Sequence, residues 1–160
     1  MDKIWKSKID ERLKIMLFRA TKETILLYGS QTWALTASEE KALNGTYTRM
    51  LRQVRNLSWK DRVDKKSIYG NLRPITEIIR ERRLRLAGHI HRDKSSPAHI
   101  TVLWQPKHGT FARGRSTTTL VDTLLKDTKQ NSTAELHSLM NDRDLWSSIS
   151  GFRSSRIDRK

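Results

Sequence analysis

The residues best suited to chemistry lie in "IRERRLRLAGHIHR", from Ile79 to Arg92, where a run of arginines ends in two histidines. The arginines could bind nucleic-acid phosphates or an anionic membrane, and the histidines could bind a metal. Residues two apart on a helix point to different faces, so His89 and His91 cannot share a metal in regular helical geometry. We therefore expect no metal and no cofactor here, with His89 packed at the helix end and His91 in solvent.

The charge of the whole chain favours a polyanionic partner. Its 160 residues include 32 Lys and Arg against 17 Asp and Glu, a formal charge of +15. A strong excess of one sign indicates partners rather than a fold. Residues 49–66 carry seven basic and two acidic side chains, a net of +5, and residues 73–94 carry seven and three, a net of +4. The loop at 105–116 and the tail at 152–160 are also basic.

These segments predict contacts to the phosphates of RNA or DNA, which carry no sequence information. Trp59 lies in the polar stretch "NLSWKDR" and is the tryptophan best placed to stack on a base. The predicted contact residues are Arg49, Arg52, Arg55, Trp59, Lys60, Arg62, Arg80, Arg82, Arg85, Arg92, Lys107, Arg113 and Arg115.

Constellations typical of enzymes are missing from the sequence. It has no GxSxG motif and no glycine-rich phosphate loop, and a polymerase would need paired aspartates to hold two metal ions. The close pair Asp142 and Asp144 lies at a predicted helix start, where acids complement the helix dipole. The chain has no cysteine, and no apolar run approaches 18 residues. We expect neither an enzyme nor a small-molecule substrate, and no membrane attachment, because the apolar face of the arginine helix is needed for packing.

Apolar periodicity predicts a mainly α fold. A first helix is expected over residues 3–28, with Trp5, Ile9, Leu13, Met16 and Ala20 facing the core and "TILLYG" as the most buried part. Thr36 and Glu39 have the spacing of a capping box before a second helix. Its predicted apolar face contains Leu43, Tyr47, Met50, Leu51 and Val54, with Arg49, Arg52 and Arg55 largely opposite.

The second half of the chain predicts further helices. Pro74 suits the first turn of a third helix, whose expected apolar face is Ile75, Ile78, Ile79, Leu86 and Ile90. Arg83 lies toward that face and can run its stem along the core, whereas Arg82, Arg85 and Arg92 point away. "HITVLW" is expected to be a short strand or extended segment, and residues 105–116 a loop. A fourth helix is expected over 118–129, and short helices follow, one capped by Ser132 and Glu135.

Several segments in order carry a resemblance that spans residues 18–146. They are "LLYGSQTWAL", "YTRMLRQVRNLSWKDRV", "IRERRLRLAGHIHR", "LWQPKHG", "RGRSTTTLVDTLLKDT" and "NDRDLW". Together they resemble the region after the catalytic palm in animal non-LTR (LINE-like) retrotransposon endonuclease–reverse transcriptases. The family usually has proline where this chain has Ser116, so the loop around Arg113 and Arg115 lacks the residue that would stiffen it.

The resemblance implies a thumb-like helical unit over residues 1–57, a basic helical C-terminal lobe over 58–150 and a flexible basic tail over 151–160. It implies no catalytic residue, because the family's aspartates and endonuclease lie outside the matching region. The expected partners are RNA or DNA and the remaining reverse transcriptase domains, in the nucleus or cytoplasm. The alternative is a small helical protein-interaction module without a nucleic-acid role.

Overall fold

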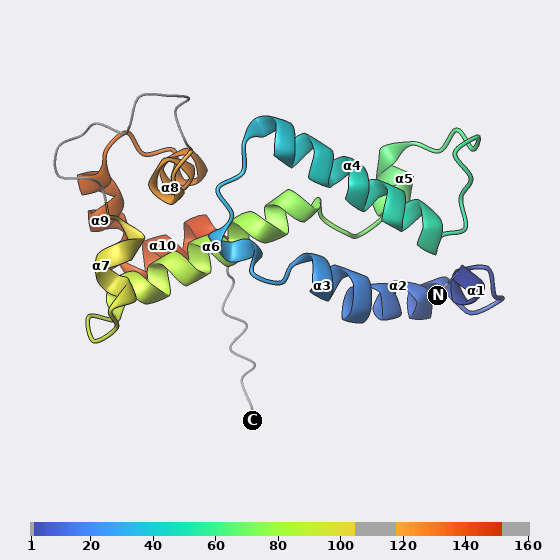
Figure 1. Ribbon diagram of the computed structural model, residues 1–160, viewed down its shortest axis with the longest axis horizontal. Helices are drawn as coiled ribbons and strands as arrows, with labels where there is room; N and C mark the ends of the chain where they lie inside the picture. The colour runs from blue at the N-terminus through green and yellow to red at the C-terminus, as the bar shows by residue number, and fades with distance from the viewer. Residues whose placement is uncertain (1, 105–117, 152–160) are drawn as a thin grey trace. The chain divides into compact units, whose positions relative to one another are not determined.

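The computed structural model describes residues 2–104 and 118–151, and every regular element in those ranges is helical (Figure 1). The mainly α prediction is therefore confirmed. The helices are α1 (Asp2–Trp5), α2 (Glu11–Phe18), the π-helical turn η1 (Arg19–Glu23), α3 (Thr24–Leu26), the 3-10 turn η2 (Ser30–Thr32), α4 (Ala37–Val54), α5 (Lys65–Tyr69), α6 (Ile75–Arg92), α7 (Ala98–Val102), α8 (Leu120–Thr128), α9 (Thr133–Asn141) and α10 (Arg143–Ser150).

The chain forms two compact units. The first contains Met1–Ser30 and Ala37–Ile79, and the second contains Gln31–Thr36 and the chain from Arg80 onward. Helix α6 begins in the first unit and contributes most of its length to the second. The compact units thus divide at a different place from the boundary predicted after residue 57, because α5 and the first turn of α6 belong with the first unit.

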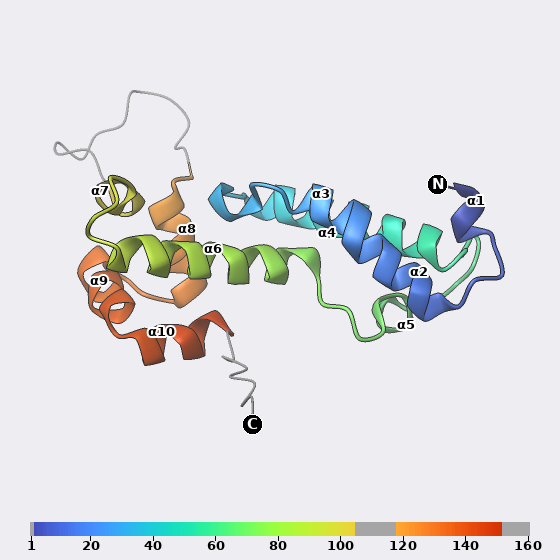
Figure 2. The ribbon, with the colours of Figure 1, turned by 90° about the horizontal axis from the view of Figure 1, so that it is seen from below.

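The first unit is built around an aromatic core. Helix α2 lies beside α4 in both views (Figures 1 and 2), and the ring centroids of Phe18 and Tyr47 are 5.7 Å apart. The ring centroid of Tyr69 on α5 lies 6.0 Å from that of Tyr47. The Tyr47 hydroxyl donates a hydrogen bond of 2.8 Å to the buried Glu23 carboxylate. Burial and then that carboxylate raise the pKa of Tyr47 well above its ordinary range, so the phenol stays protonated and keeps donating.

The predicted first helix over residues 3–28 is wrong as a single element. It is interrupted between α1 and α2, and the Lys14 ammonium satisfies freed carbonyls there by donating to Trp5 and Ser7, each at 2.8 Å. The segment "TILLYG" is also not the most buried part of this half. Leu27 is buried, but Ile25 is 77% exposed and Tyr28 is 87% exposed.

The expected apolar stripe of that first helix faces solvent rather than the core. Trp5 is buried, whereas Ile9, Leu13 and Met16 are exposed. The buried positions are instead Phe18, Glu23 and Leu27, at spacings of five and four. The π-helical turn explains this spacing, because it adds a residue to the turn and keeps a new set of side chains toward α4. An amphipathic pattern was present, but its apolar side is not the buried side.

The second unit packs its helices around the C-terminal part of α6. Helix α10 runs beside α6 in both views (Figures 1 and 2), and the Trp146 indole N–H donates to the Leu84 carbonyl at 2.9 Å. Gly88 permits this approach, since a Cβ there would lie only 2.2 Å from the Trp146 Nε1. The core consists of Leu84, Ala87, Val102, Leu124, Leu136, Met140 and Trp146.

The apolar face predicted for α6 is correct at its start and wrong further on. Ile75 and Ile79 are fully buried, but beyond them the buried positions are Arg83, Leu84, Ala87, Gly88 and His91, while Leu86 and Ile90 are half-buried. The prediction used apolar side chains alone. It did not consider small residues or a paired arginine. These residues are buried on this face because α10 and α8 pack closely against it.

Local signals in the second unit were more accurate. Helix α8 starts one residue after Thr119, which forms a complete capping box with Asp122, and its Val121 and Leu124 are buried. Ser132 caps α9 by accepting from the Glu135 N–H. "HITVLW", however, is neither a strand nor extended: most of it forms the short helix α7 and the turn that follows.

Candidate nucleic-acid interface

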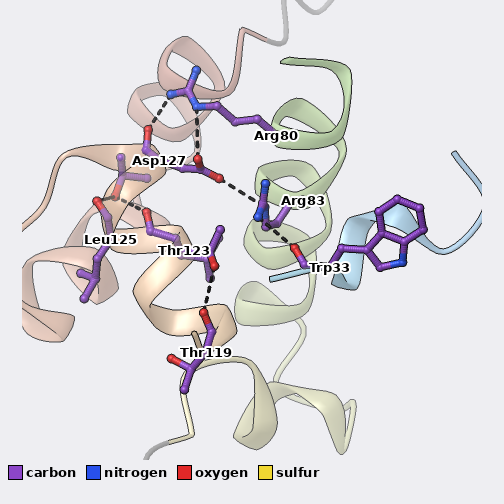
Figure 3. Close-up of polar contacts among 9 residues, drawn as sticks. Trp33, Arg80, Arg83, Thr119, Thr123, Leu125 and Asp127 are labelled. Atoms are coloured by element: carbon purple, nitrogen blue, oxygen red, sulfur yellow. Dashed lines mark hydrogen bonds and ion pairs between the residues drawn. The ribbon is translucent and has the colours of Figure 1, made fainter. Parts of the chain in front are cut away.

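Two arginines of α6 are bound to one aspartate inside the second unit (Figure 3). The Arg83 Nε lies 3.2 Å from a carboxylate oxygen of Asp127 on α8, and its Nη1 donates to the Trp33 carbonyl at 3.0 Å. Arg80 donates to the Asp127 carbonyl at 2.6 Å, and its Nε lies 3.8 Å from the carboxylate. Arg83 is buried as predicted, with its charge paired. Arg80, a predicted contact residue, has its guanidinium turned toward α8.

The other predicted arginines of α6 lie on the exposed side of the helix. Arg82 is exposed, and Arg85 is exposed with its Nη2 3.5 Å from the Glu81 carboxylate one turn away. Arg92 is exposed but donates to the Met140 carbonyl at 3.2 Å. An i, i+4 pair on a helix surface contributes only about 0.3–0.5 kcal/mol, so the Glu81 contact does not prevent Arg85 from binding a phosphate.

The placement predicted for the two histidines is reversed in the structure. His91 is 4% exposed, whereas His89 is exposed. The His91 ring packs against His99 of α7 and His137 of α9, with centroids at 5.5 and 4.9 Å, and its Nε2 lies 3.1 Å from the Asn141 Oδ1. Burial lowers the pKa of His91, and the neighbouring imidazoles add to this effect. In the described part of the chain no three His, Asp or Glu side chains are arranged to hold a metal.

Arg49 and Arg52 lie on α4 and Arg55 directly follows it, and two of these three predicted arginines have structural partners in the first unit. Arg55 pairs with Glu11 of α2 at 2.5 Å, and its side chain is mostly buried. Arg52 donates from Nη2 to the carbonyls of Ser58 and Asp61, the latter at 3.0 Å. Arg49 is exposed, and none of the described residues forms an ion pair with it. Only Arg49 of this group therefore presents its guanidinium to solvent without such a partner.

The loop after α4 presents an aromatic ring and two cations together. We call residues 57–63 the tryptophan loop. Trp59 is 84% exposed, Lys60 and Arg62 are exposed, and the Lys60 Nζ lies 5.7 Å from the centroid of the Trp59 ring. Asp61 fixes the turn by accepting from the Ser58 N–H at 2.6 Å, in addition to the Arg52 contacts. A loop held in one conformation displays these side chains without a further ordering cost.

Three predicted contact residues, Lys107, Arg113 and Arg115, lie outside the residues that the structure describes. Over residues 2–104 and 118–151, every helix is too short or too polar to cross a membrane. The candidate interface is thus represented by the tryptophan loop with Arg49 in the first unit and by Arg82 and Arg85 in the second.

Comparison with known proteins adds no relative: no protein-family model, curated protein or solved structure matches the chain.

The sequence analysis missed two features of the structure, the role of Asp127 as an arginine partner and the pocket beside the tryptophan loop. Asp127 lies 47 and 44 residues beyond its partners Arg80 and Arg83, so no local pattern connects them. Gln53 and Asn56 line a pocket next to the tryptophan loop. The sequence did contain a signal for the chain turn beside this pocket. Asn is one of the few residues that tolerate a positive φ, and Asn56 has φ +54° where α4 ends.

Proposed function

We propose that this chain binds RNA or DNA without sequence specificity, as the non-catalytic post-palm portion of a non-LTR retrotransposon reverse transcriptase. The observation that carries the binding proposal is the tryptophan loop, which places the exposed Trp59 ring beside Lys60 and also exposes Arg62. An exposed ring stacks on any base, and exposed cations bind any phosphate, so this combination suits a single strand of any sequence. The retrotransposon assignment rests on the ordered segments that resemble that family.

The charge distribution supports the same proposal. A net charge of +15 repels itself, and a polyanion that neutralises several cations removes that repulsion and releases counterions. Acidic side chains pair with Arg55, Arg80 and Arg83, whereas Trp59, Lys60 and Arg62 of the tryptophan loop are exposed to solvent.

The test is a titration of the chain against single-stranded RNA, duplex DNA and an RNA–DNA hybrid of equal length at two salt concentrations. We expect binding to all three that weakens steeply at the higher salt, with similar affinities for unrelated sequences. Absence of binding to all three at low salt would contradict the proposal.

The non-catalytic part of the proposal has its own test. Primer extension by the chain alone with added Mg²⁺ is expected to give no product. Nucleotide incorporation above background by a clean preparation would mean that this region is wrongly assigned.

The alternative function is a helical protein-interaction module, and one observation favours it. Four large apolar side chains of α2, α3 and the turn that follows are exposed, namely Leu13, Met16, Ile25 and Tyr28. Exposed apolar surface of this kind marks interaction sites in many proteins. Replacing Leu13 and Met16 with serine distinguishes the two functions: nucleic-acid affinity is unchanged if the proposal is right. If the chain does not bind nucleic acid at low salt, the protein-interaction module is the better description of its function.

A further inference from the structure

The first unit contains an open pocket of about 320 Å³ next to the tryptophan loop. It is lined by Trp5, Lys6, Gln53, Asn56, Leu57 and Ser58. Its volume is at the lower end of the ~300–1,000 Å³ typical of small-ligand sites. The lining comes from the end of α1, the last turn of α4 and the start of the loop.

Trp5 is the most informative residue of this lining. Its side chain is 2% exposed, and its indole N–H has no hydrogen-bond partner among the described residues. The residue is held in place, because the Lys22 Nζ lies 5.3 Å from the ring centroid and the Lys14 Nζ donates to its carbonyl. A buried polar group without a partner is uncommon and costs about 1–3 kcal/mol. Since an indole N–H only donates, the missing partner is an acceptor.

The other lining groups indicate which hydrogen-bonding and apolar groups a ligand of this pocket should carry. The amides of Gln53 and Asn56 each offer donors and an acceptor, the Ser58 hydroxyl offers both, and Leu57 supplies an apolar wall. Lys6 is the single cation among the six. A phosphate would accept hydrogen bonds from the donors, but it would make no contact that uses the amide acceptors or the apolar wall. A nucleobase presents ring carbonyls, ring nitrogens and an apolar face, and it uses all of these groups.

We propose that this pocket receives one unpaired base of a single-stranded nucleic acid, an inference that rests on the proposed binding function. Ser58 lines the pocket, and the next residue, Trp59, is exposed, so the base adjacent to the captured one has a ring on which to stack. Lys6, which lines the pocket, and Lys60, which follows Trp59 in the chain, are the expected contacts for the phosphates on either side of the captured base.

The first experiment compares an oligothymidylate with an abasic strand of the same length and phosphate number. The parent chain is expected to bind the base-containing strand about tenfold more tightly, since each base contact is worth roughly 1–3 kcal/mol. Because Trp59 contributes to this preference, the pocket is isolated by the double variant Lys6→Met with Gln53→Met. Both the parent chain and this double variant are also made with Trp59→Ala, which removes the contribution of the exposed ring. In that background, the double variant is expected to lose most of the preference for the base-containing strand that the parent chain retains.

The matched control is Lys8→Met, which removes the same charge from an exposed lysine that does not line the pocket. It is expected to weaken both strands equally and to keep the preference for bases. Circular dichroism first establishes that each variant is folded. If Lys6→Met with Gln53→Met behaves like Lys8→Met, the pocket does not take a base.

A second readout locates the base directly. A strand containing one 4-thiothymidine is photo-crosslinked to the parent chain, and the adducts are sequenced by mass spectrometry. Adducts at any of the six lining residues support the proposal, and adducts confined to Trp59 or to residues outside the lining overturn it. Equal binding of base-containing and abasic strands overturns the pocket alone, whereas binding to neither overturns the proposed function as well.

Discussion

The arginine run of α6 and the tryptophan loop have similar positive charge in the sequence but different surroundings in the fold. In α6, Arg80 and Arg83 are turned onto Asp127, and Arg83 is 3% exposed. In the loop, Lys60 and Arg62 are exposed, and the Lys60 ammonium lies beside the exposed Trp59 ring. The denser cluster therefore supplies part of its charge to the stability of the second unit, and the sparser one leaves its charge in solvent.

This difference shows that an arginine run predicts positive charge but not its availability. Availability depends on whether the fold brings an acid or a row of carbonyls to the same place. On α6, Arg82 and Arg85 are exposed, Arg80 is half-buried and Arg83 is buried, although all four lie within six residues.

The largest effect is expected from Asp127→Asn. Removing one partner of a buried ion pair costs about 3–5 kcal/mol, because the remaining charge is buried without compensation. Arg83 would be left in this situation, so the free energy of unfolding of the second unit should fall by an amount of this order in urea denaturation. Asp144→Asn, at an exposed position of α10, is the control and should cost far less. Equal losses for the two variants would mean that Arg83 does not depend on Asp127.

A smaller but clear loss is expected from Gly88→Ala, which tests how tightly α6 is packed. The added Cβ would meet the Trp146 indole at 2.2 Å, so the ring must move and its bond to the Leu84 carbonyl must weaken. Overpacking of a core typically costs about 1–3 kcal/mol. Gly45→Ala on α4 is the matched control, because nothing lies within 4 Å of its added Cβ. That control should be neutral or stabilising, and a neutral Gly88→Ala would contradict the close packing of α10 on α6.

The smallest stability effect is a dependence on pH from His91. Its pKa in the folded chain is lowered, chiefly by burial, so below the ordinary histidine value of about 6.5 the unfolded chain binds more protons than the folded one. Stability is therefore complete above that pH and is lost as the pH falls from about 7 toward 5. The groups that face His91 are His99, His137, Asn141 and Arg92.

Denaturation at several pH values measures this dependence. His91→Gln should flatten the decline, and His89→Gln, which changes an exposed histidine of the same helix, should leave it as in the parent. A decline that survives His91→Gln unchanged would assign it to other groups.

Sequence reasoning succeeded where the determining interaction is local. The predicted caps at Ser132 and Asp142 involve atoms two or three residues away, and their side chains accept backbone N–H groups at the starts of α9 and α10. The exposure of Trp59 also followed from its polar neighbours, while its stacking role remains a prediction.

It failed where the partner is distant or the helix irregular. The stripe through Leu13 and Met16 was assigned to the core because a regular helix was assumed, and a π-helical turn changes which side faces α4. His91 is buried because His99 and His137 arrive from other helices. Neither the residue spacing nor the composition of α6 carries that information.

The most direct test of the central claim is the salt dependence of binding to duplex DNA for three variants. Lys60→Ala with Arg62→Ala should reduce the slope of log K against log salt by about two, since each lost phosphate contact removes ~0.9. Arg82→Ala with Arg85→Ala should give a similar reduction. Arg80→Ala should leave the slope of the parent, because that guanidinium contacts Asp127 instead. A folded loop variant with the parent's slope, or an Arg80→Ala variant with a reduced one, would contradict the division between structural and phosphate-binding cations.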